Sequence, residues 1–199
     1  MIYNIMTCGV GGQGLMLLSN IIGLACAENN INIRTAETHG LAQRSGSIYT
    51  HIRIGDEIYS PLIPYGEADI LLGMEAIETL RNIEFLKPKG TIILNNYIWF
   101  PVQSTYKRVL SPETPYVDFQ SISNQLEKVS SNISIINALD IAIEAGNYLT
   151  TNTVLLGALI HTKGFPLSID QVELVLPKLV PNKALEANKR ALNLGYNAV

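Results

Sequence analysis

Charged side chains are scarce in this chain of 199 residues. Asp, Glu, Lys and Arg make up 16% of it, against about 25% in an average soluble protein. Hydrophobic residues make up 47%, and the mean hydropathy is +0.20. Such a composition favours a surface that another subunit partly covers, because obligate interfaces resemble a domain core cut in half. It also leaves open a compact protein with short polar loops.

Cysteine is nearly absent. The two thiols, Cys8 and Cys26, lie far apart in the sequence, and no CxxC pair occurs. This usage argues against a disulfide framework, and against a zinc site or iron–sulfur cluster carried by this chain. The histidines His39, His51 and His161 form no metal-binding pattern, so we expect no metal-binding residue. His51 stands in a strand pattern and His161 on an apolar helix, where both are expected to be structural.

Basic clusters and long apolar runs are also missing. The formal net charge is −3, and no Lys/Arg cluster with interleaved aromatic residues occurs, so we expect no nucleic-acid partner. No apolar run approaches the roughly 20 residues that span a bilayer, so we expect no membrane contact. The first apolar stretch has no basic leader and stops at a group of glycines, which indicates a strand and not a signal peptide. The cytoplasm is the expected compartment.

No pair of residues suited to nucleophilic catalysis stands out. Ser45 and Ser47 do not belong to a G-x-S-x-G elbow. Two acidic pairs are interpreted as charges at helix starts and not as paired catalytic carboxylates: Glu67 with Asp69, and Glu75 with Glu78. The chain therefore does not have the pattern of a complete enzyme.

The most informative segment is GVGGQG at residues 9–14. It ends an apolar run and opens an amphipathic one, which predicts a glycine turn between a strand and a helix. Glycines at such a turn allow positive φ and a close approach of a ligand or a neighbouring backbone. The helix N-terminus that follows suits an anion. The candidate cofactor-binding positions are Gly9, Gly11, Gly12, Gln13 and Gly14.

Spacing alone leaves three interpretations of this turn open. The first is a dinucleotide site, because the glycines match GxGxxG and Glu37 can serve as the acidic residue about twenty positions further on. Against it, Gly12 and Gln13 replace the usual variable pair with another glycine and a polar amide. The second is a site for another anion or for a subunit. The third is that the glycines only let helix and strand pack closely.

A second segment, HGLAQRSG at residues 39–46, follows a predicted strand. In open α/β sheets, ligands collect at the carboxyl ends of strands. An imidazole, an amide and a guanidinium at that place can orient a carboxylate, a phosphate or a carbonyl group. The candidate catalytic residues are therefore Arg44, His39 and Gln43. A solvated polar loop is the alternative that the sequence permits equally.

The hydrophobic pattern predicts a doubly wound α/β fold with a mostly parallel sheet, a βαβ glycine turn at the N-terminus and a helical C-terminal part. Expected strands cover residues 3–8, 31–35, 47–54, 57–60, 68–73, 91–95 and 133–137. Expected helices cover residues 13–28, 75–81, 118–129, 139–145, 152–163 and 182–194. No domain boundary is visible.

Four local features are also predicted. The strands 47–54 and 57–60 are expected to form a hairpin. The segment 87–90 is expected to be a turn that ends the preceding helix. Residues 97–117 are expected to be rich in loops, with 105–110 as a possible edge strand, and Gly195 is expected at the C′ position of the last helix.

Together these segments resemble the gamma-type domain of the 2-oxoacid:ferredoxin oxidoreductases. The GVGGQG turn followed by HGLAQR-x-GS carries the resemblance, and the AQR at residues 42–44 is similar to the indolepyruvate branch of that family. ADILLG-x-E at 68–75, GTIILN at 90–95 and LGAL at 156–159 fit the same branch, so a single domain over residues 1–199 is expected. Ser45 departs from the pattern, because the family tends to have a second glycine there.

The resemblance implies a subunit that completes the active site of a large catalytic alpha subunit. The complex is expected to use thiamine diphosphate, Mg²⁺ and [4Fe–4S] clusters on that partner, with no cofactor on this chain. It would oxidise an aryl 2-oxoacid with coenzyme A as co-substrate and pass electrons to ferredoxin. The glycine turn and the loop at 39–46 are expected to face the large subunit near substrate or coenzyme A. The alternatives are an NAD(P)- or FAD-binding Rossmann-type oxidoreductase domain and a structural adaptor.

Overall fold

The structure is a computed structural model that describes residues 2–40, 46–100, 102–113 and 116–199. Within these ranges the chain forms a six-stranded sheet with the strand order β2-β3-β1-β4-β5-β6. The strands are β1 (Ile2–Val10), β2 (Ile33–His39), β3 (Ser47–Gly55), β4 (Ala68–Gly73), β5 (Leu86–Asn95) and β6 (Ile133–Ile136). The neighbours β1, β4, β5 and β6 are parallel, whereas β3 is antiparallel to both β1 and β2.

The first strand, helix and strand form the expected crossover, with a difference in pairing. Because β3 is antiparallel to both of its neighbours, β1 and β2 point the same way but do not pair. The predicted hairpin between residues 47–54 and 57–60 is therefore wrong. The strand β3 fills the place between β1 and β2, and Glu57 has a φ of 58°, which is incompatible with a continued strand.

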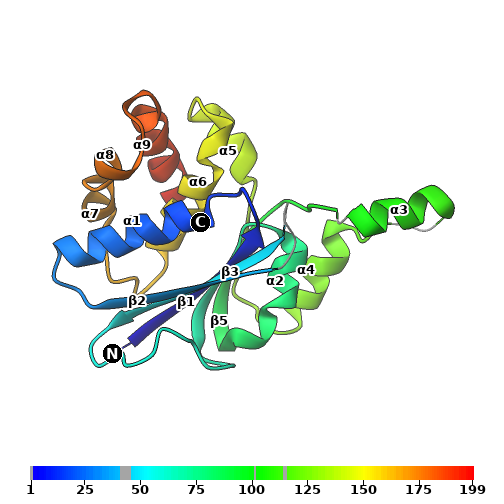
Figure 1. Cartoon of the computed structure of the whole chain (residues 1–199), viewed down its shortest axis with the longest axis horizontal. Coiled ribbons are helices and arrows are strands. Elements are labelled where there is room, and N and C mark those ends of the chain that lie inside the picture. The colour runs from blue at the N-terminus through cyan, green and yellow to red at the C-terminus, as the bar shows by residue number, and fades with distance from the viewer. Residues whose placement is uncertain (1, 41–45, 101, 114–115) are drawn as a thin grey trace.

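Helices cover both faces of the sheet, so the doubly wound α/β expectation is confirmed (Figure 1). One face carries α1 (Leu15–Glu28) and the C-terminal helices, and the other carries α2 (Ala76–Arg81) and α4 (Phe119–Glu127). The C-terminal elements are α5 (Ala138–Glu144), η2 (Tyr148–Thr150), α6 (Thr151–His161), α7 (Ile169–Glu173), α8 (Leu176–Leu179) and α9 (Asn182–Tyr196).

The alternation of side chains along β1 explains the two hydrophobic cores. Ile5 belongs to the core beneath α1 and α6, whereas Met6 and Cys8 belong to the core beneath α2 and α4. Successive side chains of a strand point to opposite faces, so a strand that is apolar throughout is buried on both sides. The short β4 is likewise buried along almost its whole length.

The segment at 87–90 is part of β5 and not a turn after a helix. The helix α2 already ends at Arg81, and a short 3-10 turn, η1 (Ile83–Phe85), leads directly into β5. The register between β4 and β5 shifts between Ala68 and Ile70. The proline and glycine that signal a turn therefore mark an irregularity inside a strand, where proline is tolerated.

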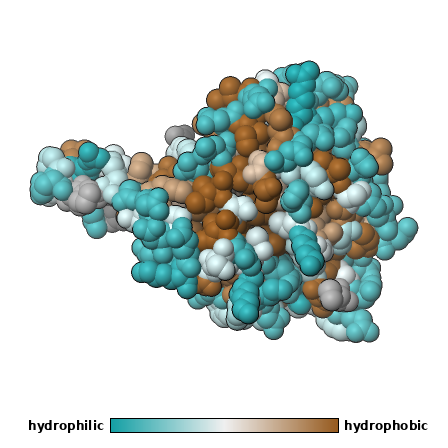
Figure 2. Space-filling view, turned by 180° about the vertical axis from the view of Figure 1, so that it is seen from behind, coloured by the Kyte–Doolittle hydropathy of each residue, from teal (hydrophilic) through white to brown (hydrophobic). Residues whose placement is uncertain are grey.

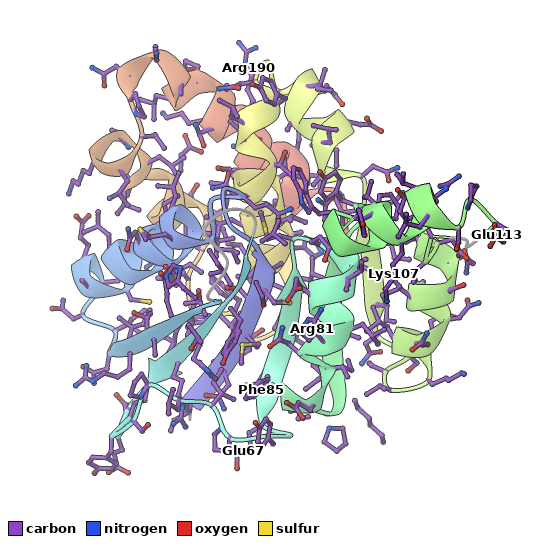
Figure 3. All side chains as sticks on the ribbon, turned by 45° about the vertical axis from the view of Figure 1, so that its right-hand side comes forward. Glu67, Arg81, Phe85, Lys107, Glu113 and Arg190 are labelled. Carbon is purple, nitrogen blue, oxygen red and sulfur yellow. The ribbon has the colours of Figure 1, made fainter. Side chains whose placement is uncertain are left out.

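The predicted edge strand at 105–110 is a helix, α3 (Val102–Leu110). Its apolar residues recur at intervals of three and four, which is the helical period. The helix projects from the body of the molecule (Figure 1), and Glu113 lies at the tip of the arm that it forms (Figure 3). Tyr106, Val109 and Leu110 on this arm are exposed.

Gly195 lies inside α9 and does not end it, so its predicted C′ role is wrong. A Cβ at Gly195 would stand 1.9 Å from the Val154 carbonyl oxygen of α6, and one at Gly157 would stand 2.1 Å from the Leu192 carbonyl oxygen of α9. These two glycines let the backbones of α6 and α9 approach each other closely. The sequence pattern correctly indicated that the backbone requires glycine at Gly195. The requirement comes from the close packing of two helices and not from a helix end.

Candidate functional site

A cavity of about 420 Å³ opens at the carboxyl ends of β1, β4 and β5. It lies between two adjacent strands whose following helices pack on opposite faces of the sheet. The helix α1 follows β1 on one face, and α2 follows β4 on the other. Ligands of open α/β sheets bind at this kind of switch point. Three parts of the chain line the cavity. The first is the glycine turn at residues 10–13, and the second is Met74 after β4 with Asn95 at the end of β5 and Tyr97 and Trp99 after it. The third is the C-terminal part, with Leu139, Tyr148, Leu149 and Thr151.

The glycines of the turn have different surroundings. Gly12 and Gly14 have φ values of 95° and 81°, a region that side chains rarely enter, and nothing lies within 4 Å of a Cβ at Gly12. At Gly9, in contrast, a Cβ would stand 2.9 Å from the Met74 Cβ. Gly9 thus serves packing, whereas Gly12 faces open space beside the cavity.

Two amide side chains fix the floor of the cavity. The Gln13 Oε1 accepts from the Val10 N–H at 2.9 Å, and its Nε2 donates to the Met74 carbonyl at 3.3 Å. The Asn95 Nδ2 donates to the same carbonyl at 3.1 Å, and its Oδ1 accepts from the Ala138 N–H at 3.2 Å. These bonds connect β1, β4, β5 and α5 where their ends meet. The amide of Gln13 is therefore engaged with the chain's own backbone.

A buried carboxylate holds the aromatic side of the cavity. The Glu75 Oε1 accepts from the Trp99 N–H at 2.9 Å, and its Oε2 accepts from the Glu78 N–H at 2.8 Å as the N-cap of α2. The Ala76 N–H donates to the Tyr97 carbonyl at 2.9 Å. Burial raises the pKa of Glu75, and burial together with the charge of Glu75 raises the pKa of Tyr97. The segment after β5 is thus fastened to the start of α2.

The interpretation of the acidic pairs as charges at helix starts holds for one pair only. Glu75 caps α2, as expected, and Glu78 lies in its first turn. Asp69, in contrast, lies in β4, where it accepts from the Asn4 N–H at 2.7 Å and pairs with Lys87. Asp69 therefore connects β4 to β1 and β5. It does not lie at the start of a helix, because α2 begins only at Ala76.

The loop at 39–46 is described at its two ends. Gln43, Arg44 and Ser45 lie outside the described residues. The Gly40 N–H donates to the Ser47 carbonyl at 2.7 Å, and the Gly11 N–H donates to the Gly46 carbonyl at 2.9 Å. The C-terminal end of the loop therefore meets the glycine turn.

His39, the first residue of that loop, and Ser47, directly after it, have different surroundings. The Ser47 hydroxyl donates to the Glu78 Oε2 at 2.6 Å, which connects the start of β3 to α2. His39 is exposed, and its Nε2 lies 3.3 Å from the Glu37 Oε2. Glu37 also accepts from the Ser19 hydroxyl at 3.1 Å. Because β3 separates β2 from β1, Glu37 does not have the position next to the glycine strand that a dinucleotide site uses.

The cysteines and the other histidines have structural surroundings. Cys8 and Cys26 are buried, which raises the pKa of both thiols, that of Cys26 to about 12. The buried His51 accepts from the Ile63 N–H at its Nδ1 at 3.1 Å, and burial lowers its pKa. His161 is exposed and packs edge-on against Tyr196. No group of three His, Cys, Asp or Glu residues suited to a metal ion occurs in the described part of the chain.

The aromatic lining of the cavity was not identified from the sequence. Tyr97 and Trp99 follow β5 in a passage interpreted only as loop-rich, and Tyr148 lies far away in the sequence. The sequence feature that could have identified them was local: Trp99 is the single tryptophan, and it follows the carboxyl end of a buried strand.

None of the helices in the described ranges combines the length and apolar character needed to cross a membrane.

Comparison with known proteins identifies the family. The family model described as pyruvate ferredoxin/flavodoxin oxidoreductase matches residues 4–198. The chain is 39% identical over 197 residues to indolepyruvate oxidoreductase subunit IorB of Pyrococcus horikoshii, covering 98% of this chain and 95% of that protein. It is 38% identical over 196 residues to the IorB subunit of Methanothermobacter thermautotrophicus, covering 98% and 97%.

Solved structures agree in fold. The pyruvate oxidoreductase subunit PORC of Thermotoga maritima superposes with a TM-score of 0.71 at 23% identity, covering 99% of this chain and 96% of that one. A 2-oxoglutarate:ferredoxin oxidoreductase from Magnetococcus marinus gives a TM-score of 0.71 at 19% identity, covering 99% of this chain and 31% of that one. The same fold thus occurs as a subunit and as part of a longer chain. This chain belongs to the pyruvate ferredoxin/flavodoxin oxidoreductase family, as the resemblance of its two glycine-containing motifs indicated.

Proposed function

We propose that this chain, as a single gamma-type domain over residues 1–199, is a subunit of an aryl-2-oxoacid:ferredoxin oxidoreductase of the indolepyruvate type. The observation that carries the proposal is identity of 38–39% over almost the whole chain with subunits named for indolepyruvate oxidoreductase. The partner is a large catalytic alpha subunit, and the compartment is the cytoplasm. The dinucleotide alternative has less support, because Glu37 bonds to Ser19 and lies two strands away from the glycine turn.

The proposed reaction is a coenzyme A-dependent oxidative decarboxylation. An aryl 2-oxoacid anion and coenzyme A give the acyl thioester, carbon dioxide, one proton and two electrons, which ferredoxin accepts singly. The carbon–carbon bond to the carboxylate breaks and a carbon–sulfur bond forms. Thiamine diphosphate with Mg²⁺ and [4Fe–4S] clusters supply the decarboxylation and the electron transfer when bound to the partner. The two buried, separate thiols of this chain do not fit a cluster, so we assign the clusters to the partner.

The role proposed for this chain is to complete the site at the carboxyl end of its sheet. The glycine turn and the loop at 39–46 would face the large subunit near substrate or coenzyme A. The bond between Gly11 and Gly46 supports this role, because it places the end of the loop directly beside the turn. Arg44, Gln43 and His39 would orient a carboxylate or phosphate group of the ligand, for which a guanidinium is well suited.

The surface near the cavity also suits a partner subunit. Figure 2 shows apolar side chains gathered over the centre of one face, beside the projecting arm of α3. The exposed large hydrophobic residues on α5, η2 and the segment after β5 are Trp99, Phe100, Leu139, Ile143, Tyr148 and Leu149. Contiguous exposed apolar patches mark interaction sites on soluble domains. A covering subunit would also account for the low charge content.

The proposal is tested by purifying the tagged chain from its own host without oxygen. We expect an iron–sulfur subunit to co-elute with it in a fixed ratio. Isothermal titration of the same chain with NAD, NADP and FAD is expected to show no binding. Elution of the chain alone, together with tight binding of one of these dinucleotides, would replace the proposal with the Rossmann-type alternative.

A further inference from the structure

The cavity at the end of the sheet has the chemistry of a small-molecule site. Its volume of about 420 Å³ falls within the roughly 300–1,000 Å³ of known ligand pockets. Three aromatic residues, Tyr97, Trp99 and Tyr148, line it together with the aliphatic Leu149. Trp99, Tyr148 and Leu149 are also exposed, so these side chains surround an opening and not a closed core. Flat aromatic ligands stack on such side chains.

Some polar groups that line the cavity are hydrogen-bonded within the described part of the chain, whereas the N–H of Gly12 is not. Both side-chain amides of the floor, Gln13 and Asn95, donate to the Met74 carbonyl and accept from backbone N–H groups. Among the described residues, in contrast, no acceptor binds the N–H of Gly12. Gly12 lines the cavity with open space around its Cα. Within the described ranges, an unbonded donor thus lies at the glycine turn, while the aromatic residues come from the segments after β5 and before α6.

We propose that this cavity binds the planar aromatic ring of an anionic ligand, with the ring against Trp99 and Tyr148 and the anionic group toward the glycine turn. Two ligands of the proposed reaction have such a ring: the aryl side chain of the 2-oxoacid and the adenine of coenzyme A. The choice of these ligands rests on the proposed function. The existence of the ring site rests on the cavity alone.

Glu75 has a positioning role in this site. Its carboxylate holds the Trp99 backbone, and the next residue holds the Tyr97 carbonyl. Neither oxygen of Glu75 is directed to the ligand, because both accept backbone N–H groups. The aromatic side of the cavity is therefore preorganised by α2, which lowers the conformational cost of binding.

The single tryptophan makes the site directly observable. The full-length chain is titrated with phenylpyruvate and, separately, with adenosine 3′,5′-bisphosphate, while Trp99 fluorescence and titration heats are recorded. Pyruvate and inorganic phosphate are the controls without a ring. We expect a saturable change in Trp99 fluorescence with at least one aromatic ligand and none with the controls. A response to phenylpyruvate alone assigns the site to the oxoacid, and a response to the bisphosphate alone assigns it to coenzyme A.

Two tyrosines provide matched variants that keep the fluorescent residue. Tyr148 lines the cavity, whereas the more exposed Tyr59 does not. We expect Tyr148→Ala to weaken binding of the aromatic ligand about tenfold, equivalent to about 1.4 kcal/mol, and Tyr59→Ala to leave it unchanged. Equal affinity for ligands with and without a ring, or no effect of Tyr148→Ala, would overturn the ring site. Because no turnover is measured, failure of the proposed oxidoreductase activity would be seen separately.

Discussion

His51 illustrates how a single buried residue sets a pH limit on the fold. Its Nδ1 accepts a hydrogen bond from the Ile63 N–H, which requires an unprotonated nitrogen, and burial and the nearby Arg53 charge lower its pKa from 6.5. The unfolded chain therefore binds a proton at a higher pH than the folded chain. The stabilisation is complete above pH 6.5 and is lost as the pH falls through the lowered folded pKa.

We predict that the contribution of His51 to the free energy of unfolding decreases as the pH is lowered from about 7 toward 5, measured by urea denaturation as the difference between the unchanged protein and a His51 variant. The variant His51→Gln keeps an acceptor for the Ile63 N–H but does not titrate. Its stability should depend less on pH in this window. An identical pH dependence in both proteins would contradict the role given to His51.

Arg44 is the residue of the proposed site that carries a guanidinium for the ligand's anionic group. We predict that Arg44→Ala lowers arylpyruvate turnover of the assembled complex by about 10- to 100-fold, because a charge-assisted hydrogen bond contributes about 1.5–3 kcal/mol. Thermal unfolding should be unchanged. Arg34→Ala is the control, since Arg34 lies on β2 and its guanidinium bonds to the neighbouring Ile33 carbonyl. Unaltered kinetics of the Arg44 variant would remove this residue from the site.

Among the elements, the contact between α6 and α9 depends on two glycines. A Cβ at Gly157 would stand 2.1 Å from the Leu192 carbonyl oxygen, so the helices would have to separate. We predict that Gly157→Ala lowers the free energy of unfolding by about 1–3 kcal/mol through overpacking. Gly23→Ala is the matched control, because it lies in α1 with nothing within 4 Å, and should raise stability by about 0.5–1 kcal/mol. Equal effects of the two substitutions would show that the helix contact is not tight.

The arm formed by α3 should contribute little to the stability of the fold. Val109 is 72% exposed, whereas Leu159 of α6 is fully buried. We predict that Val109→Ala changes the free energy of unfolding by less than about 0.5 kcal/mol, and that Leu159→Ala lowers it by about 2–5 kcal/mol. Chemical denaturation of both variants measures the difference. A large loss for Val109→Ala would mean that α3 packs on the body in solution.

Local patterns predicted most of the elements but not their pairing. The strand at residues 68–73 was predictable because it is a short apolar run, and helices such as α6 because they are long and apolar. The insertion of β3 between β1 and β2 depends on contacts across the sheet, which no local pattern encodes. The Lys87–Pro88–Lys89–Gly90 segment and Gly195 have turn residues whose purpose only tertiary packing reveals.

At the scale of the whole molecule, the sequence predicted one half of the candidate site. The glycine turn was recognisable, because its residues are contiguous and lie between a strand and a helix. The aromatic half was not, because Trp99 and Tyr148 come from separate segments that meet only in the fold. The catalytic roles of Arg44, His39 and Gln43 and the cofactor-binding role of the glycine turn stay predictions, whereas the family membership is confirmed over nearly the whole length.

The central claim is that this chain completes an aryl 2-oxoacid oxidoreductase. It is tested most directly by measuring viologen reduction by the purified large subunit, without oxygen, with and without this chain. The account predicts reduction that requires an arylpyruvate, coenzyme A and both subunits together. Equal reduction by the large subunit alone would contradict the claim, as would a reconstituted complex with no response to any arylpyruvate.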